Sequence, residues 1–111
     1  LALAASDIGT AVYDLAAQAV RADARTFAIF GLPCADETPF ALWRERVHPD
    51  DREPVQAALD ALLASPSTPY RIQYRIHRAD DNALRRIAAR AIVSRRNGLG
   101  TPLEVIAVTQ D

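Results

Sequence analysis

Apolar residues recur at helical spacing between residues 50 and 64. Val55, Leu59 and Leu62 fall on one side of a helix of this length, while most of the remaining positions hold polar residues or alanine. This pattern predicts a long amphipathic helix of about four turns. We expect the helix to pack on the rest of the domain through these three leucine and valine side chains.

The first residues of this stretch and the prolines that follow it predict where the helix begins and ends. Asp50 and Glu53 have the spacing of a capping box, in which Asp50 accepts a hydrogen bond from a free backbone N–H. Asp51 adds a second negative charge at the positive end of the helix dipole. Pro66 and Pro69 end the helix, because proline is not tolerated in a helix interior.

After the helix, apolar and polar residues alternate. Ile72, Tyr74 and Ile76 are separated by polar residues, which predicts a strand with one buried face. Two further strands are expected at 87–95 and 103–110, because turn-forming residues separate these apolar stretches. The three strands would form two consecutive antiparallel hairpins.

The first half of the chain predicts shorter elements. Strands are expected at 10–15 and 18–21, and short helices at 23–30 and 40–47. With the later hairpins, this order predicts the α+β class: a five-stranded antiparallel sheet with short helices and one long helix on one face.

Composition and charge narrow the class of protein. The 111 residues carry a net charge of −1, so no basic surface points to nucleic acid or to an anionic membrane. The single cysteine, Cys34, excludes an internal disulfide, and no apolar run approaches the roughly 20 residues of a membrane span. We expect a cytoplasmic domain, whether or not its parent protein is anchored in a membrane.

Both ends of the chain look cut. The sequence begins at Leu1 without a methionine and stops at Asp111 directly after an apolar strand. We therefore expect a single domain over residues 1–111, excised from a larger protein. Residues 1–7 are alanine-rich and apolar, and are expected to be the end of a helix that enters from upstream.

Few residues suggest chemistry, and each has a structural explanation. His48 precedes a proline at the helix entry, where it would orient the loop, and His77 has no second ligand at metal spacing. The acidic residues at 50–53 are explained by helix capping rather than by a Mg²⁺ site. Cys34 has no adjacent basic residue that would activate its thiol. We therefore expect no metal and no catalytic group.

Several motifs occur in a recognisable order. Residues 27–33 read Phe-Ala-Ile-Phe-Gly-Leu-Pro, Trp43 follows, and residues 47–52 read Val-His-Pro-Asp-Asp-Arg. An Asp81-Asn82 turn comes later. In this order the chain resembles the PAS domain family, specifically the sensory-box branch of bacterial sensor histidine kinases and diguanylate cyclases. The resemblance covers nearly the whole chain, although Gln18 stands where the family usually has a glycine.

The resemblance implies a PAS fold and a sensory role. Such a domain is an input module without enzymatic activity, and it passes a ligand- or interface-induced change to a C-terminal output domain that begins after Asp111. The output would be a histidine kinase or a diguanylate cyclase. A ligand-free structural dimerisation relay is the alternative. A small α+β enzyme is disfavoured, unless a polar pair such as Gln73 and His77 converges in a pocket.

Bulky and small residues are expected to face each other between the helices and the sheet. Plain core packing explains them, and we favour it over the alternative, which is a cavity for a ligand or water. The residues that would line such a cavity are Ala11, Tyr13, Phe27, Phe30, Trp43, Leu59, Tyr74, Ile76, Ile87, Ala89 and Ala107.

The sequence argues against haem and photochemical flavin, and it leaves any other ligand unknown. The flavin-binding light sensors of this superfamily carry their cysteine in an Asn-Cys-Arg-Phe-Leu-Gln segment, whereas Cys34 lies between Pro33 and Ala35. Haem-binding relatives place an axial histidine on the long helix, and residues 50–64 contain none. We expect neither cofactor to stay with the purified domain.

The outer face of the sheet is expected to be a docking surface. The last strand is apolar on both sides, unlike an antiparallel strand with one face in water. An apolar patch rimmed by charge is typical of a partner surface, so we expect a homodimer with the N-terminal segment as a partial cover. The residues concerned are Leu3, Ala88, Ile92, Ile106 and Val108.

Overall fold

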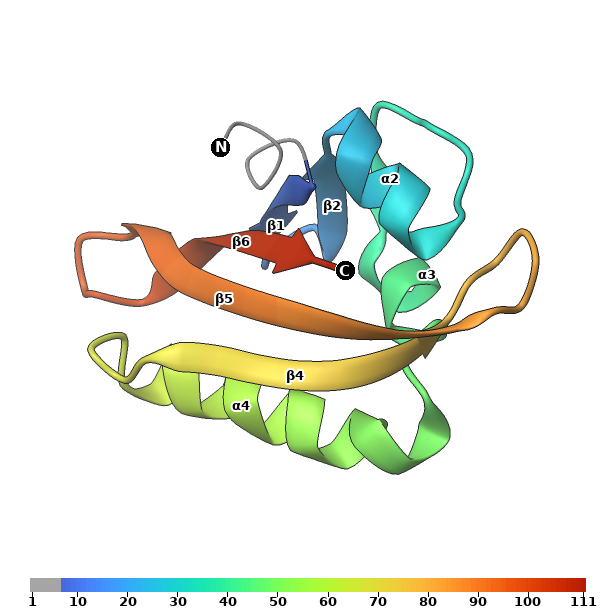
Figure 1. Cartoon of the computed structure of the whole chain (residues 1–111). Helices are drawn as coiled ribbons and strands as arrows, with labels where there is room; N and C mark the ends of the chain where they lie inside the picture. Colours follow the sequence, from blue (N-terminus) through green and yellow to red (C-terminus); the bar gives the residue numbers. More distant parts are fainter. Residues whose placement is uncertain (1–6) are drawn as a thin grey trace.

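The computed structural model of the chain describes residues 7–111, so Leu3 and most of the predicted helix end at 1–7 lie outside the described residues. The chain forms one curled antiparallel sheet with helices on one face (Figure 1). The elements are β1 Ile8–Asp14, β2 Ala19–Ala22, α2 Ala24–Phe30, β3 Thr38–Pro39, α3 Phe40–Arg44, the 3₁₀ turn η1 Pro49–Asp51, α4 Arg52–Ala64, β4 Tyr70–His77, β5 Leu84–Arg96 and β6 Pro102–Gln110.

The sheet has the order β3-β2-β1-β6-β5-β4, so the first long strand and the last strand are neighbours at its centre. The predicted α+β fold is confirmed, but the predicted number of strands is wrong. A sixth strand, Thr38–Pro39, pairs with β2 at the sheet edge through Val20 and Thr38. Two residues that include a proline have no alternation to detect, which explains why this strand was not predicted.

The start of the long helix differs from the predicted capping box. The side chain of His48 accepts a hydrogen bond from the backbone N–H of Asp50 at 3.1 Å, so His48 orients the loop as predicted. Asp50 caps nothing with its own side chain, and α4 begins at Arg52 without a side-chain cap bond. The capping box with Glu53 was therefore wrong.

Asp51 instead joins the helix start to the sheet edge. Its carboxylate accepts hydrogen bonds from the backbone N–H of Arg75 at 2.8 Å, from Nε at 3.0 Å and from Nη2 at 2.8 Å. A carboxylate engaged by both the guanidinium fork and a backbone donor is held in one orientation. The contact places the first turn of α4 against β4.

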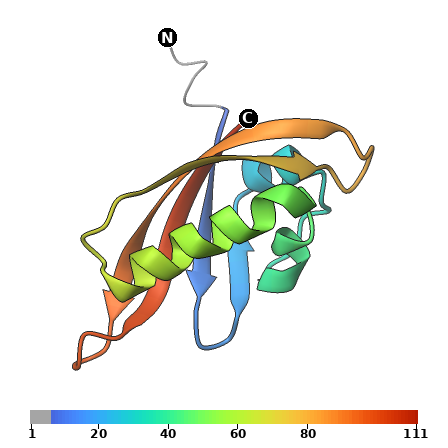
Figure 2. The same cartoon turned by 90° about the horizontal axis from the view of Figure 1, so that it is seen from below.

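The apolar stripe of α4 contacts the domain unevenly. Leu62 is 1% exposed and packs on Ala91 and Val105 of the sheet. Val55 and Leu59 face the same way but stay half-buried, because they border a cavity. Figure 2 shows α4 crossing the face of the sheet as one straight rod. All three side chains face the sheet, as predicted, but only Leu62 packs tightly against it.

The shorter elements follow local backbone chemistry. Asp23 caps α2 by accepting from the Thr26 N–H at 2.9 Å, and Gly31 ends the helix in the left-handed region with φ of 68°. Gln18 has a φ of 52°, which is the conformation that glycine adopts without strain. The helix predicted at 40–47 ends earlier, at Arg44. Within residues 7–111, no helix is long and apolar enough to cross a membrane.

Replacing Asp51 by asparagine tests the contact with Arg75. Hydrogen bonds from Arg75 hold the pKa of the Asp51 carboxyl well below its usual range. A depressed folded-state pKa stabilises the fold above the unfolded-state pKa of about 3.9, and this stabilisation is lost as pH falls through the folded-state pKa. We expect Asp51→Asn to lower the urea midpoint at pH 7 and to match the wild type in strong acid.

Asp50→Asn is the matched control, because the Asp50 side chain is exposed and makes no cap bond. Its urea midpoint should stay close to that of the wild type at pH 7. Equal midpoints for Asp51→Asn and the wild type at pH 7 would contradict the assignment.

Candidate functional site

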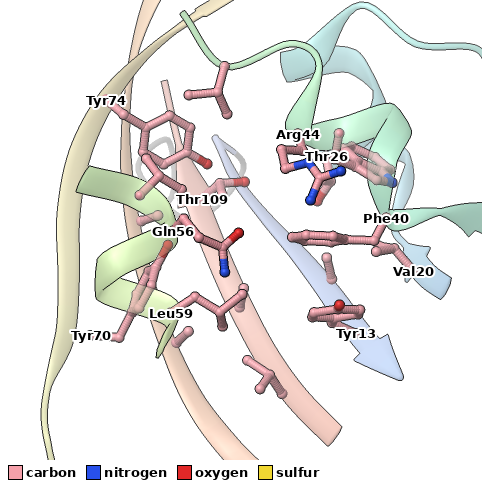
Figure 3. A pocket seen from close by; sticks show the side chains of 18 of the residues that line it. Tyr13, Val20, Thr26, Phe40, Arg44, Gln56, Leu59, Tyr70, Tyr74 and Thr109 are labelled. Atoms are coloured by element: carbon pink, nitrogen blue, oxygen red, sulfur yellow. The ribbon is translucent and has the colours of Figure 1, made fainter. Parts of the chain in front are cut away.

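A cavity of about 140 Å³ lies between the inner face of the sheet and helices α2, α3 and α4 (Figure 3). Its walls are mostly apolar, and polar groups gather at a few positions. The lining residues are Ala11, Tyr13, Val20, Thr26, Phe30, Phe40, Trp43, Arg44, Val47, Arg52, Val55, Gln56, Leu59, Tyr70, Tyr74, Ala89, Ala91, Val105, Ala107 and Thr109.

Small side chains in register form the cavity floor. Ala91 of β5 lies opposite Ala107 of β6, and Ala107 lies opposite Ala11 of β1. In the adjacent row, Ala89 lies opposite Thr109, which lies opposite Gly9. Residues opposite each other on neighbouring strands project to the same face of a sheet. Two rows of small residues therefore leave space beneath α4 that larger side chains would fill.

Gly9 also brings α2 close to the sheet. A Cβ atom at this position would overlap the side-chain hydroxyl and the backbone of Thr26. Thr26 itself is 2% exposed, and its hydroxyl donates to Asp23 Oδ1 at 2.8 Å. The glycine therefore permits a backbone approach that closes one end of the cavity.

Aromatic rings form the wall on the side of α3. Tyr13 and Phe40 are stacked, with ring centroids 4.3 Å apart and planes 7° from parallel. Trp43 contacts Phe30 edge-to-face at 5.1 Å and tilts against Phe27 at 5.2 Å. These are favourable arrangements for aromatic rings, so the contacts between the rings stabilise the wall.

A buried hydrogen-bond chain ties this wall to the edge strand. The indole Nε1–H of Trp43 donates to Thr38 Oγ1 at 2.8 Å, and that hydroxyl donates to the carbonyl of Val20 at 3.2 Å. Both groups lie in the core, where an unpaired polar atom would be costly. The two-residue strand β3 thus positions the tryptophan of the cavity wall.

Polar groups reach the cavity from β4 and β6. Thr109 is 8% exposed, and its hydroxyl has no hydrogen-bond partner within residues 7–111. Burial raises the pKa of the Tyr74 phenol and of the Tyr70 phenol, so both stay protonated at neutral pH. Figure 3 shows the Tyr74 and Thr109 side chains together on one side of the cavity.

Two arginines, Arg44 and Arg52, are among the lining residues, and both are exposed. The Arg44 guanidinium is exposed and sits 5.9 Å from the centre of the Phe40 ring. Burial raises the pKa of Tyr13, and the nearby Arg44 charge partly offsets this. Arg52 donates through Nε to the Val47 carbonyl at 3.1 Å, so it anchors the helix start to the preceding loop.

The structure places most of the predicted lining residues at the cavity and three elsewhere. Phe27, Ile76 and Ile87 are buried in the core and are not among the residues that line this cavity. Those that line it are Ala11, Tyr13, Phe30, Trp43, Leu59, Tyr74, Ala89 and Ala107. The prediction missed Thr109, although it shares the inward face of β6 with Val105 and Ala107.

The other residues with chemical potential lie outside the cavity. His48 and His77 stack with ring centroids 5.4 Å apart, and Gln73 is exposed on the other face of the sheet. Cys34 is exposed in a loop. Across residues 7–111, no three His, Cys, Asp or Glu side chains are grouped as a metal site would require.

Comparison with known proteins identifies the family. The sequence model described as "PAS fold" matches residues 19–109. This match spans most of the chain, so the chain belongs to the PAS family. No curated protein matches the sequence.

Solved structures share this fold. A sensory box histidine kinase/response regulator from Burkholderia thailandensis has a TM-score of 0.83 and 26% identity over 99% of this chain and 80% of that chain. The N-terminal domain of a diguanylate cyclase with PAS/PAC sensor from Marinobacter aquaeolei has a TM-score of 0.79 and 19% identity, covering 94% of both chains. A putative light and redox sensing histidine kinase domain from Haloarcula marismortui has a TM-score of 0.78 and 15% identity, covering 94% of this chain and 88% of that chain.

Thr38→Val tests the hydrogen-bond chain behind the cavity wall. The substitution keeps the side-chain shape but leaves the buried Trp43 N–H without an acceptor. We expect it to lower the free energy of unfolding by about 1–3 kcal/mol, measured by urea denaturation. Thr101→Val, at an exposed turn position, should change it by less than about 0.5 kcal/mol. Equal effects of the two substitutions would show that the buried hydrogen bond does not stabilise the wall.

Proposed function

We propose that this chain is a sensory and dimerising input domain of a bacterial signal-transduction protein. The observation that carries the proposal is the cavity between the sheet and the helices of a PAS fold, with a floor to which the last strand, β6, contributes Ala107 and Thr109. The similar domains come from a sensory box histidine kinase/response regulator, a diguanylate cyclase with PAS/PAC sensor and a light and redox sensing histidine kinase. The domain would lie in the cytoplasm and span residues 1–111 of a larger protein, whether or not that protein is anchored in a membrane.

The position of the chain ends supports a signal route. Ile8 pairs with Gln110, so the residues that lead into and out of the sheet lie side by side. Thr109 on the cavity floor is two residues before Asp111. The Asp111 carboxylate forms a salt bridge with Arg85, whose Nη2 lies 2.6 Å from Oδ2. A change at the floor would therefore shift the end of β6. Asp111 would be the exit to a C-terminal output domain, either a histidine kinase or a diguanylate cyclase.

The cavity chemistry favours sensing over catalysis. An enzyme of this size would need convergent acid and base groups in its pocket. Gln73 and His77, the pair that would have favoured an enzyme, do not line the cavity. A ligand-free relay remains the second candidate function, because an interface alone can also transmit a change between subunits.

The outer face of the sheet supports the dimerisation part of the proposal. Ile92, Ile106 and Val12 lie in register across three strands, and Ile92 is 62% exposed. Val108 and the exposed Ala88 extend this apolar patch. An exposed row of apolar side chains on a sheet is a surface that association would bury.

Charges flank the row of Val12, Ile106 and Ile92 on both sides. Arg90 lies opposite Arg71 and Val108 in the row next to Ile92, and like charges in register repel. Asp14 lies opposite Glu104 on the other side, where Arg95 Nη1 lies 3.6 Å from Glu104 Oε2. In a two-fold interface the arginines of one copy can meet the Asp14 side of its partner, which would relieve the repulsion between Arg71 and Arg90.

Replacing Ile92 by glutamate tests the dimer. We expect the wild-type chain to sediment as a concentration-dependent dimer, because association buries the apolar row. Ile92→Glu should give a folded monomer, since a carboxylate at the centre of the interface would lose its hydration. Circular dichroism would confirm that the variant folds.

Leu99→Glu is the matched control, because Leu99 is 93% exposed in the β5–β6 turn, away from the patch. This variant should dimerise like the wild type. A wild-type chain that remains monomeric at high micromolar concentration would refute the dimer.

A further inference from the structure

The charges at the cavity are all positive. Among the lining residues that the structure describes, only Arg44 and Arg52 are charged, and both are exposed. Arg44 belongs to α3 and Arg52 begins α4, and Gln56 lines the cavity one helical turn after Arg52. Exposed lining residues mark where a cavity meets solvent. The cavity therefore opens between α3 and the first turns of α4, at a rim that carries positive charge.

The two arginines differ in the partners that they already have. Arg52 donates through Nε to the Val47 carbonyl at 3.1 Å and through Nη2 to the Glu45 carbonyl at 3.3 Å. Arg44 has no such bond and no carboxylate partner across residues 7–111, and its guanidinium lies 5.9 Å from the centre of the Phe40 ring. A planar fork of free N–H donors matches a carboxylate, which can accept two hydrogen bonds from it.

The Arg44 guanidinium adjoins the aromatic wall of the cavity. Phe40 stacks on Tyr13 with ring centroids 4.3 Å apart, and both rings line the cavity with Arg44. Burial raises the pKa of the Tyr13 phenol, and the Arg44 charge partly lowers it, so the charge acts on both rings of this stack. A molecule whose apolar part touches these rings would bring a polar end to Arg44.

The cavity floor limits the rest of the molecule. The volume of about 140 Å³ is close to the roughly 150 Å³ of an apolar protein cavity that binds benzene. Ala91, Ala107 and Ala11 lie in register across the floor and offer only methyl groups. The Thr109 hydroxyl oxygen is fully shielded, so a ligand in the cavity cannot reach it. The polar end of a ligand therefore belongs at the rim.

We propose that this cavity binds an amphipathic monoanion, with an apolar body of about the size of benzene and one carboxylate. The apolar body lies on the alanine floor beneath Leu59, and the carboxylate lies at the rim, where it accepts hydrogen bonds from Arg44. Arg52 adds a second positive charge at the same rim. A single negative charge suits the site because only the Arg44 guanidinium is free. The inference rests on the proposed sensory function and names the chemical class of its ligand.

The test compares phenylacetate with phenylacetamide, which has nearly the same shape but no charge. Dissociation constants are measured at pH 7 by NMR titration of the whole chain. We expect the wild type to bind phenylacetate more tightly than phenylacetamide. In Arg44→Gln, the dissociation constant for phenylacetate should rise about fivefold, as for loss of an exposed ion pair, and that for phenylacetamide should stay within twofold.

Arg96→Gln is the matched control, because it removes the same charge from an exposed position opposite Pro102, away from the cavity. It should leave both dissociation constants within twofold, since distant surface charges are screened. Equal effects of the two arginine substitutions on phenylacetate would overturn the proposal. So would tighter binding of phenylacetamide than of phenylacetate by the wild type, or no saturable binding of phenylacetate.

A second pair of measurements tests whether the ring enters the cavity. Ala107→Leu fills the floor, so the folded variant should lose saturable binding of both probes. In the wild type, phenylacetate should shift the methyl NMR signals of Ala91 and Ala107, which requires no substitution. Phenylacetate that binds the Leu variant as well as the wild type, or that leaves both methyl signals unshifted, would be paired with a surface arginine only, and the proposal would be wrong.

The oligomeric state of the same samples separates this inference from the proposed function. If the chain sediments as a dimer but binds neither probe, the ligand class is wrong and the interface relay stands. If phenylacetate binds with the expected dependence on Arg44 but the chain is monomeric, the ligand class stands and the dimeric input function is wrong.

Discussion

The contact between Asp51 and Arg75 determines how far α4 lies from the sheet. Three hydrogen bonds to one carboxylate hold the first turn of the helix at the edge strand β4. At the other end, Leu62 packs against Ala91 and Val105. The helix is thus held at both ends. Between them it spans a floor of small residues, and the space beneath it stays open.

The same arrangement connects the cavity with the ends of the chain. The floor is shared by β5, β6 and β1, and the last two of these strands are paired up to Ile8 and Gln110. One face of this central pair borders the cavity, and the other carries the half-buried Val12 and Ile106, which lie in register with the exposed Ile92. A displacement of β6 would therefore change both the shape of the cavity and the position of the apolar row on the outer face. This geometry underlies the proposed coupling of ligand, interface and output.

The sequence predicted what depends on local pattern and missed what depends on long-range contacts. Strand alternation, the helical spacing of apolar residues and the turn-forming residues located most elements within a few residues. The role of Asp51 was misread, because an acidic residue at a helix start fits capping as well as an ion pair with a strand 24 positions away. Thr109 was missed since its lack of a hydrogen-bond partner becomes visible only when the inner face is assembled.

Small floor residues keep a cavity open beneath α4. Crystal structures under xenon pressure can detect this space, because xenon occupies apolar cavities of this size. We expect a xenon atom between Leu59 and Ala107 in the wild type and none in Ala107→Leu, with α4 in the same position in both. A wild-type structure without xenon, in which α4 lies directly on Ala107, would contradict it.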